Sequence, residues 1–121
     1  MLADSKAFSG FSTDDIPATR SFYEDTLGIP VSDNHGMLLL HLAGGRDTLV
    51  YPKPAHVPAE YTTLNFPVPD IEAAVRELTA RGVVFDHEDG VDELGISRGE
   101  GPLIAWFRDP AGNILSVIQE S

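Results

Sequence analysis

The chain has 121 residues, enough for one hydrophobic core, and 42% of them are hydrophobic while 22% are charged. It contains no cysteine, which excludes disulfides, thiol nucleophiles, thiolate metal sites and iron–sulfur clusters. Eight basic and nineteen acidic residues give a formal charge of −11, which repels nucleic-acid phosphates and anionic membranes and favours cationic solutes.

Neither a membrane span nor an export signal is indicated. The longest apolar run, Met37–Leu40, is far too short to cross a bilayer. The first five residues lack the basic and apolar stretches of a secretory signal. These observations predict a cytoplasmic protein that binds neither nucleic acid nor membrane.

The sequence contains an internal repeat. Phe8–Ala18 aligns with Thr63–Ala73, so that Asp15 falls on Asp70. Each copy begins as a short strand and reaches an Asp that can cap a helix. The chain is therefore expected to hold two copies of one supersecondary unit, the half-modules 6–54 and 61–120 of a single domain, 1–121.

A helix of about three turns is predicted after each capping Asp, ending at Gly28 or Gly82. In the second helix, four apolar residues lie at i, i+3, i+4 and i+7 and share one face: Ile71, Ala74, Val75 and Leu78. That face should pack on a sheet. The first helix, with Pro17 in its first turn, is expected to be its counterpart.

After each helix the chain is predicted to form three strands joined by turns. Gly44-Gly45 indicates a two-residue hairpin turn between strands 38–43 and 47–51, and Asp109–Asn113 indicates the turn between strands 103–108 and 114–119. Pro52–Glu60, with three prolines, is expected to link the halves. Glu88–Gly101, with four glycines, is expected to be an exposed loop.

Alternation predicts which side chains face the concave side of each sheet. In strand 63–68, Leu64 should pack under the helix while Thr63 and Asn65 face away. A two-residue turn at Gly44-Gly45 places Leu39 opposite Val50 and His41 opposite Thr48. A slip of one residue would reverse these faces.

The second hairpin leaves a similar choice. A four-residue turn places Phe107 opposite Ile114 and directs Trp106 outward. Phe107 is then the candidate for the concave face of the sheet. A longer turn would reverse that assignment. Both aromatic side chains are also compatible with ordinary core packing.

The doubled unit resembles the vicinal oxygen chelate superfamily, which includes glyoxalase I, extradiol dioxygenases, fosfomycin-modifying enzymes and bleomycin-binding resistance proteins. The resemblance rests on the Asp-capped helix with Phe-Tyr and Leu-Gly near its end, the hairpin strands, and Asp-Pro-x-Gly-Asn before the last strand. It covers Ala7 to Gln119. It implies an α+β fold of two βαβββ modules that form an incomplete eight-stranded barrel or cup, with the helices outside.

Metal-dependent members of this superfamily carry ligands on the first, fourth, fifth and eighth strands. The matching positions here are Phe8, Val50, Thr63 and Ser116. Two are apolar and two are neutral hydroxyls, whereas such sites use imidazole or carboxylate donors. The resemblance therefore implies a protein without metal or other cofactor.

His41 is the one candidate for an acid, a base or an orienting group in the cup. Its alternative is a structural histidine bonded to a hydroxyl such as that of Thr48. No set of a nucleophile, a base and an acid that orients the base can be identified in the sequence, so no catalytic residue is assigned.

The leading hypothesis is a metal-independent, homodimeric protein that binds a small cationic or aromatic molecule, such as an antibiotic or a hydrophobic metabolite, and sequesters it. The predicted ligand-binding residues are Phe8, Leu39, His41, Val50, Thr63, Asn65, Phe107 and Ser116. The alternatives are a metal-dependent lyase, isomerase or dioxygenase of the glyoxalase type with displaced ligands, a metal-free enzyme that uses His41, and a module without a ligand.

Overall fold

The computed structural model describes residues 1–99 and 101–120, which form two compact units. The first unit is Met1–His56 and the second is Val57–Ser121. The division falls between His56 and Val57, inside the proline-rich stretch that follows the first hairpin. Within the described residues, no helix is both long and apolar enough to cross a membrane.

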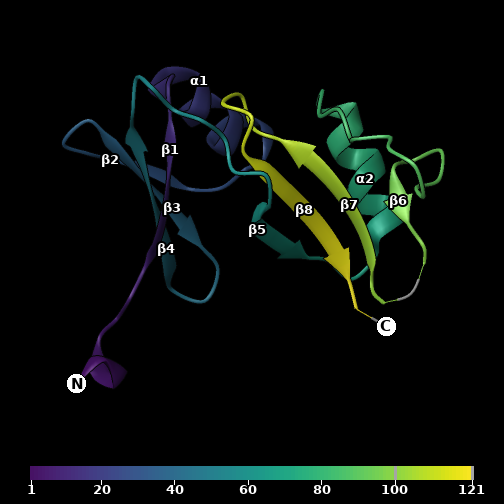
Figure 1. The fold of residues 1–121 in the computed structure, drawn as a ribbon, viewed down its shortest axis with the longest axis horizontal. Helices are drawn as coiled ribbons and strands as arrows, with labels where there is room; N and C mark the ends of the chain where they lie inside the picture. The colour runs from purple at the N-terminus through teal and green to yellow at the C-terminus, as the bar shows by residue number, and fades with distance from the viewer. Residues whose placement is uncertain (100, 121) are drawn as a thin grey trace. The chain divides into compact units, whose positions relative to one another are not determined.

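The first unit is a four-stranded mixed sheet with one helical segment (Figure 1). Strand order is β1-β4-β3-β2, with β1 parallel to β4 and the other pairs antiparallel. In chain order the elements are a short 3-10 helix η1 (Leu2–Asp4), β1 (Ser9–Thr13), α1 (Ile16–Ser21), a π-helical stretch η2 (Phe22–Thr26), β2 (Val31–Asn34), β3 (Met37–Leu42) and β4 (Arg46–Pro52).

The predicted helix cap is confirmed in this unit. Asp15 accepts a hydrogen bond from the backbone N–H of Ala18 at 3.1 Å, satisfying a donor that the helix leaves open. Tyr23, from η2, is fully buried, and its ring centroid lies 6.1 Å from that of Phe11 in β1. Phe11 therefore marks the face of the sheet that the helical segment covers.

The hairpin between β3 and β4 differs from its predicted register. Its turn has three residues, 43–45, so that Leu42 pairs with Arg46 and Leu39 pairs with Leu49. The two-residue turn expected from Gly44-Gly45 is therefore wrong. The observed register places Leu38, Leu40 and Val50 on the face of Phe11, where all three are buried. Burial of these three large aliphatic side chains explains the register.

The second unit repeats the plan with strand order β5-β8-β7-β6. Its elements are β5 (Thr62–Pro67), α2 (Ile71–Ala80), β6 (Ile96–Ser97), β7 (Leu103–Arg108) and β8 (Ile114–Gln119) (Figure 1). The α+β fold with two βαβββ modules is thus confirmed. The eight strands form two separate four-stranded sheets and not a closed barrel. β6 lies within the segment expected to be an exposed loop, and its Ile96 is fully buried.

Helix α2 packs on β7 and β8 of this sheet. Asp70 caps it by accepting from the backbone N–H of Ala73 at 3.2 Å, as predicted. Ile71 and Val75 are buried at 1% exposure, which confirms the predicted apolar face. A second bond reaches the first turn of the helix, because the side chain of Gln119 accepts from the N–H of Ile71 at 2.8 Å.

Phe107 belongs to the core under the helix and not to the open face of the sheet. It pairs with Leu115 on β8, is 1% exposed, and its ring centroid lies 5.3 Å from that of Phe85. The sequence-based assignment of Phe107 as a cup residue is therefore wrong. Trp106 pairs with Ser116, and alternation directs both to the opposite, open face.

The turn between β7 and β8 decides this alternation. Arg108 pairs with Ile114, so the turn has five residues and not four. The carboxylate of Asp109 accepts from the N–H of Ala111 and the N–H of Asn113 through Oδ1, and from the side-chain amide of Asn113 through Oδ2, at 2.9–3.0 Å. Gly112, at φ 85°, takes the left-handed conformation that this closed turn requires.

Replacing Asp109 by Ala should cost about 2–4 kcal/mol of unfolding free energy, because three donors lose a charged acceptor beside the buried Asn113. Urea unfolding followed by circular dichroism measures this loss. The control variant Asp14→Ala, at an exposed position, should stay within about 0.5 kcal/mol of the parent. Equal stability of the two variants would contradict the role given to the turn.

Candidate functional site

The predicted site residues of the first unit fall on two faces of its sheet. Val50 is fully buried on the helix side, so its place in a ligand-binding surface is ruled out by the register. Leu39 and His41 lie on the opposite, open face, paired with Leu49 and Asp47. Phe8 directly precedes β1 and is 66% exposed.

His41 has partners that the sequence did not indicate. Its Nδ1 lies 3.0 Å from Oδ1 of Asp47, and its Nε2 lies 2.7 Å from Oγ of Ser32. The expected partner, Thr48, instead lies buried on the other face and shares a hydrogen bond with Ser9. The sequence alone does not identify Asp47 as a partner of His41, because the two residues come together only in the observed register.

In the second unit the structure brings Asn65 and Ser116 together. They pair across β5 and β8, and the Ser116 hydroxyl donates to Oδ1 of Asn65 at 2.6 Å. Thr63 sits at a bulge in β5, and its hydroxyl donates to the backbone carbonyl of Ile114 at 3.0 Å. Asn65 and Ser116 therefore lie on the same face as Trp106, where Asn65 is exposed and Ser116 is fully buried, whereas the hydroxyl of Thr63 bonds across the bulge.

A cavity of about 710 Å³ lies beside Trp106, within the second unit. This volume is in the range of small-molecule sites. The indole N–H of Trp106 donates to Oγ1 of Thr62 at 3.2 Å, which fixes the ring at the cavity wall. The cavity is lined by Val57, Pro58, Ala59, Glu60, Tyr61, Thr62, Asp86, Glu88, Asp89, Gly90, Val91, Ser97, Trp106, Arg108 and Ile114.

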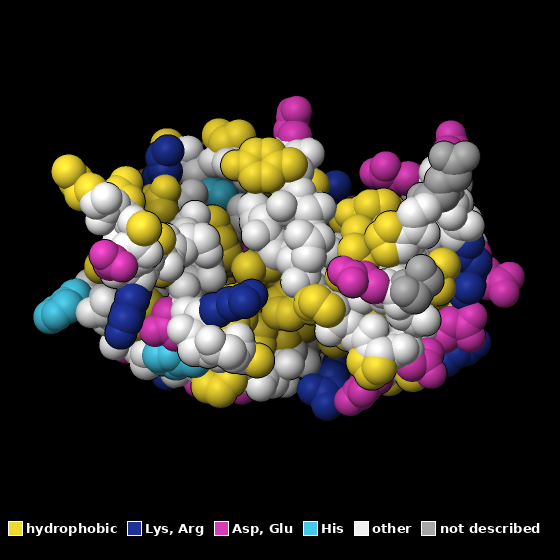
Figure 2. All heavy atoms as spheres, turned by 90° about the horizontal axis from the view of Figure 1, so that it is seen from below, with side chains coloured by type: hydrophobic (Ala, Val, Ile, Leu, Met, Phe, Trp, Pro, Cys, Tyr) yellow, Lys and Arg dark blue, Asp and Glu magenta, His cyan; other side chains and the backbone are white. Residues whose placement is uncertain are grey.

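The electrostatics of this cavity favour cations. Its lining holds four carboxylates and one guanidinium, and that guanidinium, on Arg108, is already paired with Asp86 at 3.5 Å. The whole second unit carries twelve acidic and four basic residues. On the face drawn in Figure 2, most acidic side chains lie on the side that holds α2 and β6. Such a field concentrates cationic solutes at an apolar wall.

His87 holds the acidic lip of the cavity, which is formed by 86–91. Its Nδ1 lies 2.9 Å from the carbonyl oxygen of Phe85 and its Nε2 lies 3.0 Å from that of Glu93. Both nitrogens can donate only when the ring is protonated. The bond to Glu93, then the bond to Phe85, and the charges of Asp92 and Asp86 raise the pKa of His87 above its usual 6.5.

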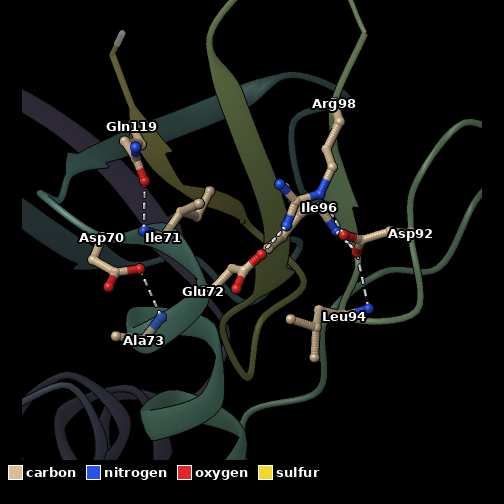
Figure 3. Close-up of polar contacts among 9 residues, drawn as sticks. All are labelled: Asp70, Ile71, Glu72, Ala73, Asp92, Leu94, Ile96, Arg98 and Gln119. Atoms are coloured by element: carbon tan, nitrogen blue, oxygen red, sulfur yellow. Dashed lines mark hydrogen bonds and ion pairs between the residues drawn. The ribbon is translucent and has the colours of Figure 1, made fainter.

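The chain that follows this lip, from Asp92 onward, is held by Arg98 (Figure 3). The guanidinium bonds Asp92 at 2.7 Å and also Glu72 on α2. Asp92 in turn accepts from the N–H groups of Leu94 and Ile96. The bond to Arg98, together with these backbone bonds, lowers the pKa of Asp92 below its usual 3.8. Asp92, which directly follows the acidic lip, is thus linked through Arg98 to helix α2.

The side chains at the superfamily's metal positions do not form a metal site. Phe8 and the buried Val50 offer no donor atom, and the hydroxyls of Thr63 and Ser116 are neutral and already donate to protein oxygens. Across residues 1–99 and 101–120, no group of three or more His, Asp or Glu side chains is placed to hold a metal ion. The donor set therefore does not fit the divalent ion of the metal-dependent members.

The sequence matches one family model over residues 9–117, that of the Glyoxalase/Bleomycin resistance protein/Dioxygenase superfamily. The chain belongs to this superfamily. The match spans both units and both helices, so the family and the fold agree. No curated protein sequence matches the chain.

Solved structures with the same fold include proteins of several kinds. A glyoxalase family protein from Enterococcus faecalis is 23% identical, with a TM-score of 0.72 over 98% of this chain and 99% of the other. The antibiotic-binding protein TnmS3 from Streptomyces sp. CB03234 is 21% identical, with a TM-score of 0.71 over 98% of each chain. The fosfomycin resistance protein FosX from Listeria monocytogenes is 13% identical, with a TM-score of 0.72 over 95% of this chain and 92% of the other.

Sequence reasoning missed most residues around the cavity. The predicted four-residue turn directs Trp106 outward, whereas the observed turn has five residues and places Trp106 on the face of the cavity. Asp86, Glu88 and Asp89 stand close together in the sequence, but no sequence pattern places this acidic run beside Trp106. The linker side of the cavity, 57–61, carries no motif at all.

Stability should depend on pH through His87. A pKa raised by folding means that its stabilising effect is complete below about pH 6.5 and is lost as the pH rises through the folded value. The melting temperature of the parent should therefore exceed that of His87→Gln in acid, and the difference should shrink by pH 8.5. The matched variant His35→Gln, at an exposed turn, should follow the parent. A difference in melting temperature between the parent and His87→Gln that does not change with pH would contradict the contact of both ring nitrogens of His87 with carbonyl oxygens.

Proposed function

We propose that the protein is a metal-independent binding protein that takes up a small cationic, aromatic molecule at the cavity beside Trp106 and sequesters it. The observation that carries the proposal is an indole ring, held by Thr62, at the wall of a cavity rimmed by four carboxylates. A planar cation gains from the face of an indole and from nearby negative charge together.

Several features support binding over turnover at this cavity. Its polar side chains are carboxylates, hydroxyls and one paired guanidinium, and the residues at the superfamily's metal positions are poor ligands. Sequestration needs only shape, charge and apolar area. The antibiotic-binding protein TnmS3 shares the fold, which makes an antibiotic a reasonable choice of ligand class.

The open face beyond the cavity is part of the same proposal. Asn65 is exposed on β5 and accepts a hydrogen bond from Ser116, which pairs with Trp106 and is itself fully buried, so a ligand larger than the cavity would reach Asn65. A cytoplasmic location and a homodimer, in which a second copy covers edge strands such as β2 and β6, also belong to this proposal.

A thermal-shift titration with acriflavine, a planar aromatic cation, tests the proposal on protein dialysed against EDTA. At 100 times its dissociation constant, a ligand that binds only the folded state adds about 2.7 kcal/mol of stability and raises the melting temperature. The variant Trp106→Leu should weaken binding about 5- to 30-fold, since a cation–aromatic contact of about 1–2 kcal/mol is lost.

The matched control is Tyr51→Leu, an aromatic change at an exposed position of the first unit, which should bind as the parent does. Fluorescein, a planar anion, should cause no shift. Equal shifts in melting temperature with the cation and the anion would contradict the proposed cavity. An equal loss of affinity in Trp106→Leu and Tyr51→Leu would contradict it as well.

A further inference from the structure

The open face of the first sheet carries a chain of three polar side chains on three neighbouring strands. Ser32 is on β2, His41 on β3 and Asp47 on β4. Asp47 pairs directly with His41. Ser32 lies diagonally from it, because the backbone N–H of His41 bonds the carbonyl of Pro30, two residues before Ser32. The sheet itself therefore fixes all three positions.

The distances define the order of the chain and its protons. Asp47 is a carboxylate and can only accept, so Nδ1 of His41, 3.0 Å away, must carry the hydrogen. In the neutral ring, Nε2 is then unprotonated and accepts from the hydroxyl of Ser32 at 2.7 Å. Hydroxyl, imidazole and carboxylate are thus connected in the order that activates a serine nucleophile.

The three side chains are also accessible. The side chains of His41 and Asp47 are 41% and 45% exposed, and Ser32 is half-buried. A second serine–histidine contact in this unit, Ser12 with His56 at 2.6 Å, uses Nδ1 of the ring and provides an internal comparison.

We propose that Ser32, His41 and Asp47 form a hydrolytic site for activated esters, with Ser32 as the nucleophile, His41 as the general base and Asp47 as its positioning residue. This site is separate from the cavity at Trp106 and does not depend on the function proposed for it. The ester class follows from the groups present, which supply a nucleophile and a base. A stable leaving group such as a phenolate departs without an additional acid in the site.

In the first step, Oγ of Ser32 bonds to the carbonyl carbon of the ester while its proton passes to Nε2 of His41. The bond from carbon to the leaving oxygen then breaks, the leaving alcohol or phenol takes that proton, and an acyl-serine remains. In the second step, His41 removes a proton from water, whose oxygen attacks the acyl carbon. The bond to Oγ breaks and Ser32 regains the proton, so ester and water give acid and alcohol.

The test uses the full chain with a fluorophosphonate probe, which labels activated serines, and with p-nitrophenyl acetate. Mass spectrometry should locate the label on Ser32. His41→Ala and Ser32→Ala should each lower labelling and hydrolysis at least about tenfold, since a general base contributes about 10²- to 10⁴-fold. Asp47→Asn should reduce both about tenfold or more while its melting temperature stays near that of the parent.

The matched control is Ser12→Ala, which removes the other serine–histidine contact and should leave labelling and hydrolysis unchanged. Label spread over several serines, or equal rates in the parent and in folded His41→Ala and Asp47→Asn, would overturn the proposal. In that event the three residues serve only as a hydrogen-bonded brace between strands.

Discussion

The closed turn at Asp109 is the constraint on which the second unit depends. One carboxylate accepts three hydrogen bonds within five residues, and these bonds set the length of the turn between β7 and β8. The period of a strand is two, so a turn shorter by one residue would exchange the faces of Trp106 and Phe107. The observed length sends Phe107 to the core beside Phe85 and leaves Trp106 at the cavity.

Much of the fold follows from local patterns in the sequence. The repeat around Asp15 and Asp70 indicated two modules, because a capping carboxylate and an apolar stripe need only neighbouring residues to form. Alternation in β5 was also informative, since Leu64 pairs with buried Leu115 while Asn65 faces away. These features do not depend on distant parts of the chain.

The site was less predictable because it depends on register. Each hairpin turn is one residue longer than the sequence suggested, and each error transferred a residue between faces: Val50 in the first unit and Phe107 in the second. The partners of His41 were missed for a related reason. Asp47 lies opposite it only with a three-residue turn, and Ser32 comes from a strand nine residues earlier.

The central claim is that an aromatic cation binds beside Trp106 without a metal. Trp106 is the chain's single tryptophan, so its fluorescence reports on this position alone. Titration with N-methylquinolinium, in buffer containing EDTA, should quench that fluorescence along a saturating curve, with no change on adding zinc or magnesium in excess of EDTA. Absence of saturable quenching in the folded protein, or quenching that requires a divalent ion, would contradict the account.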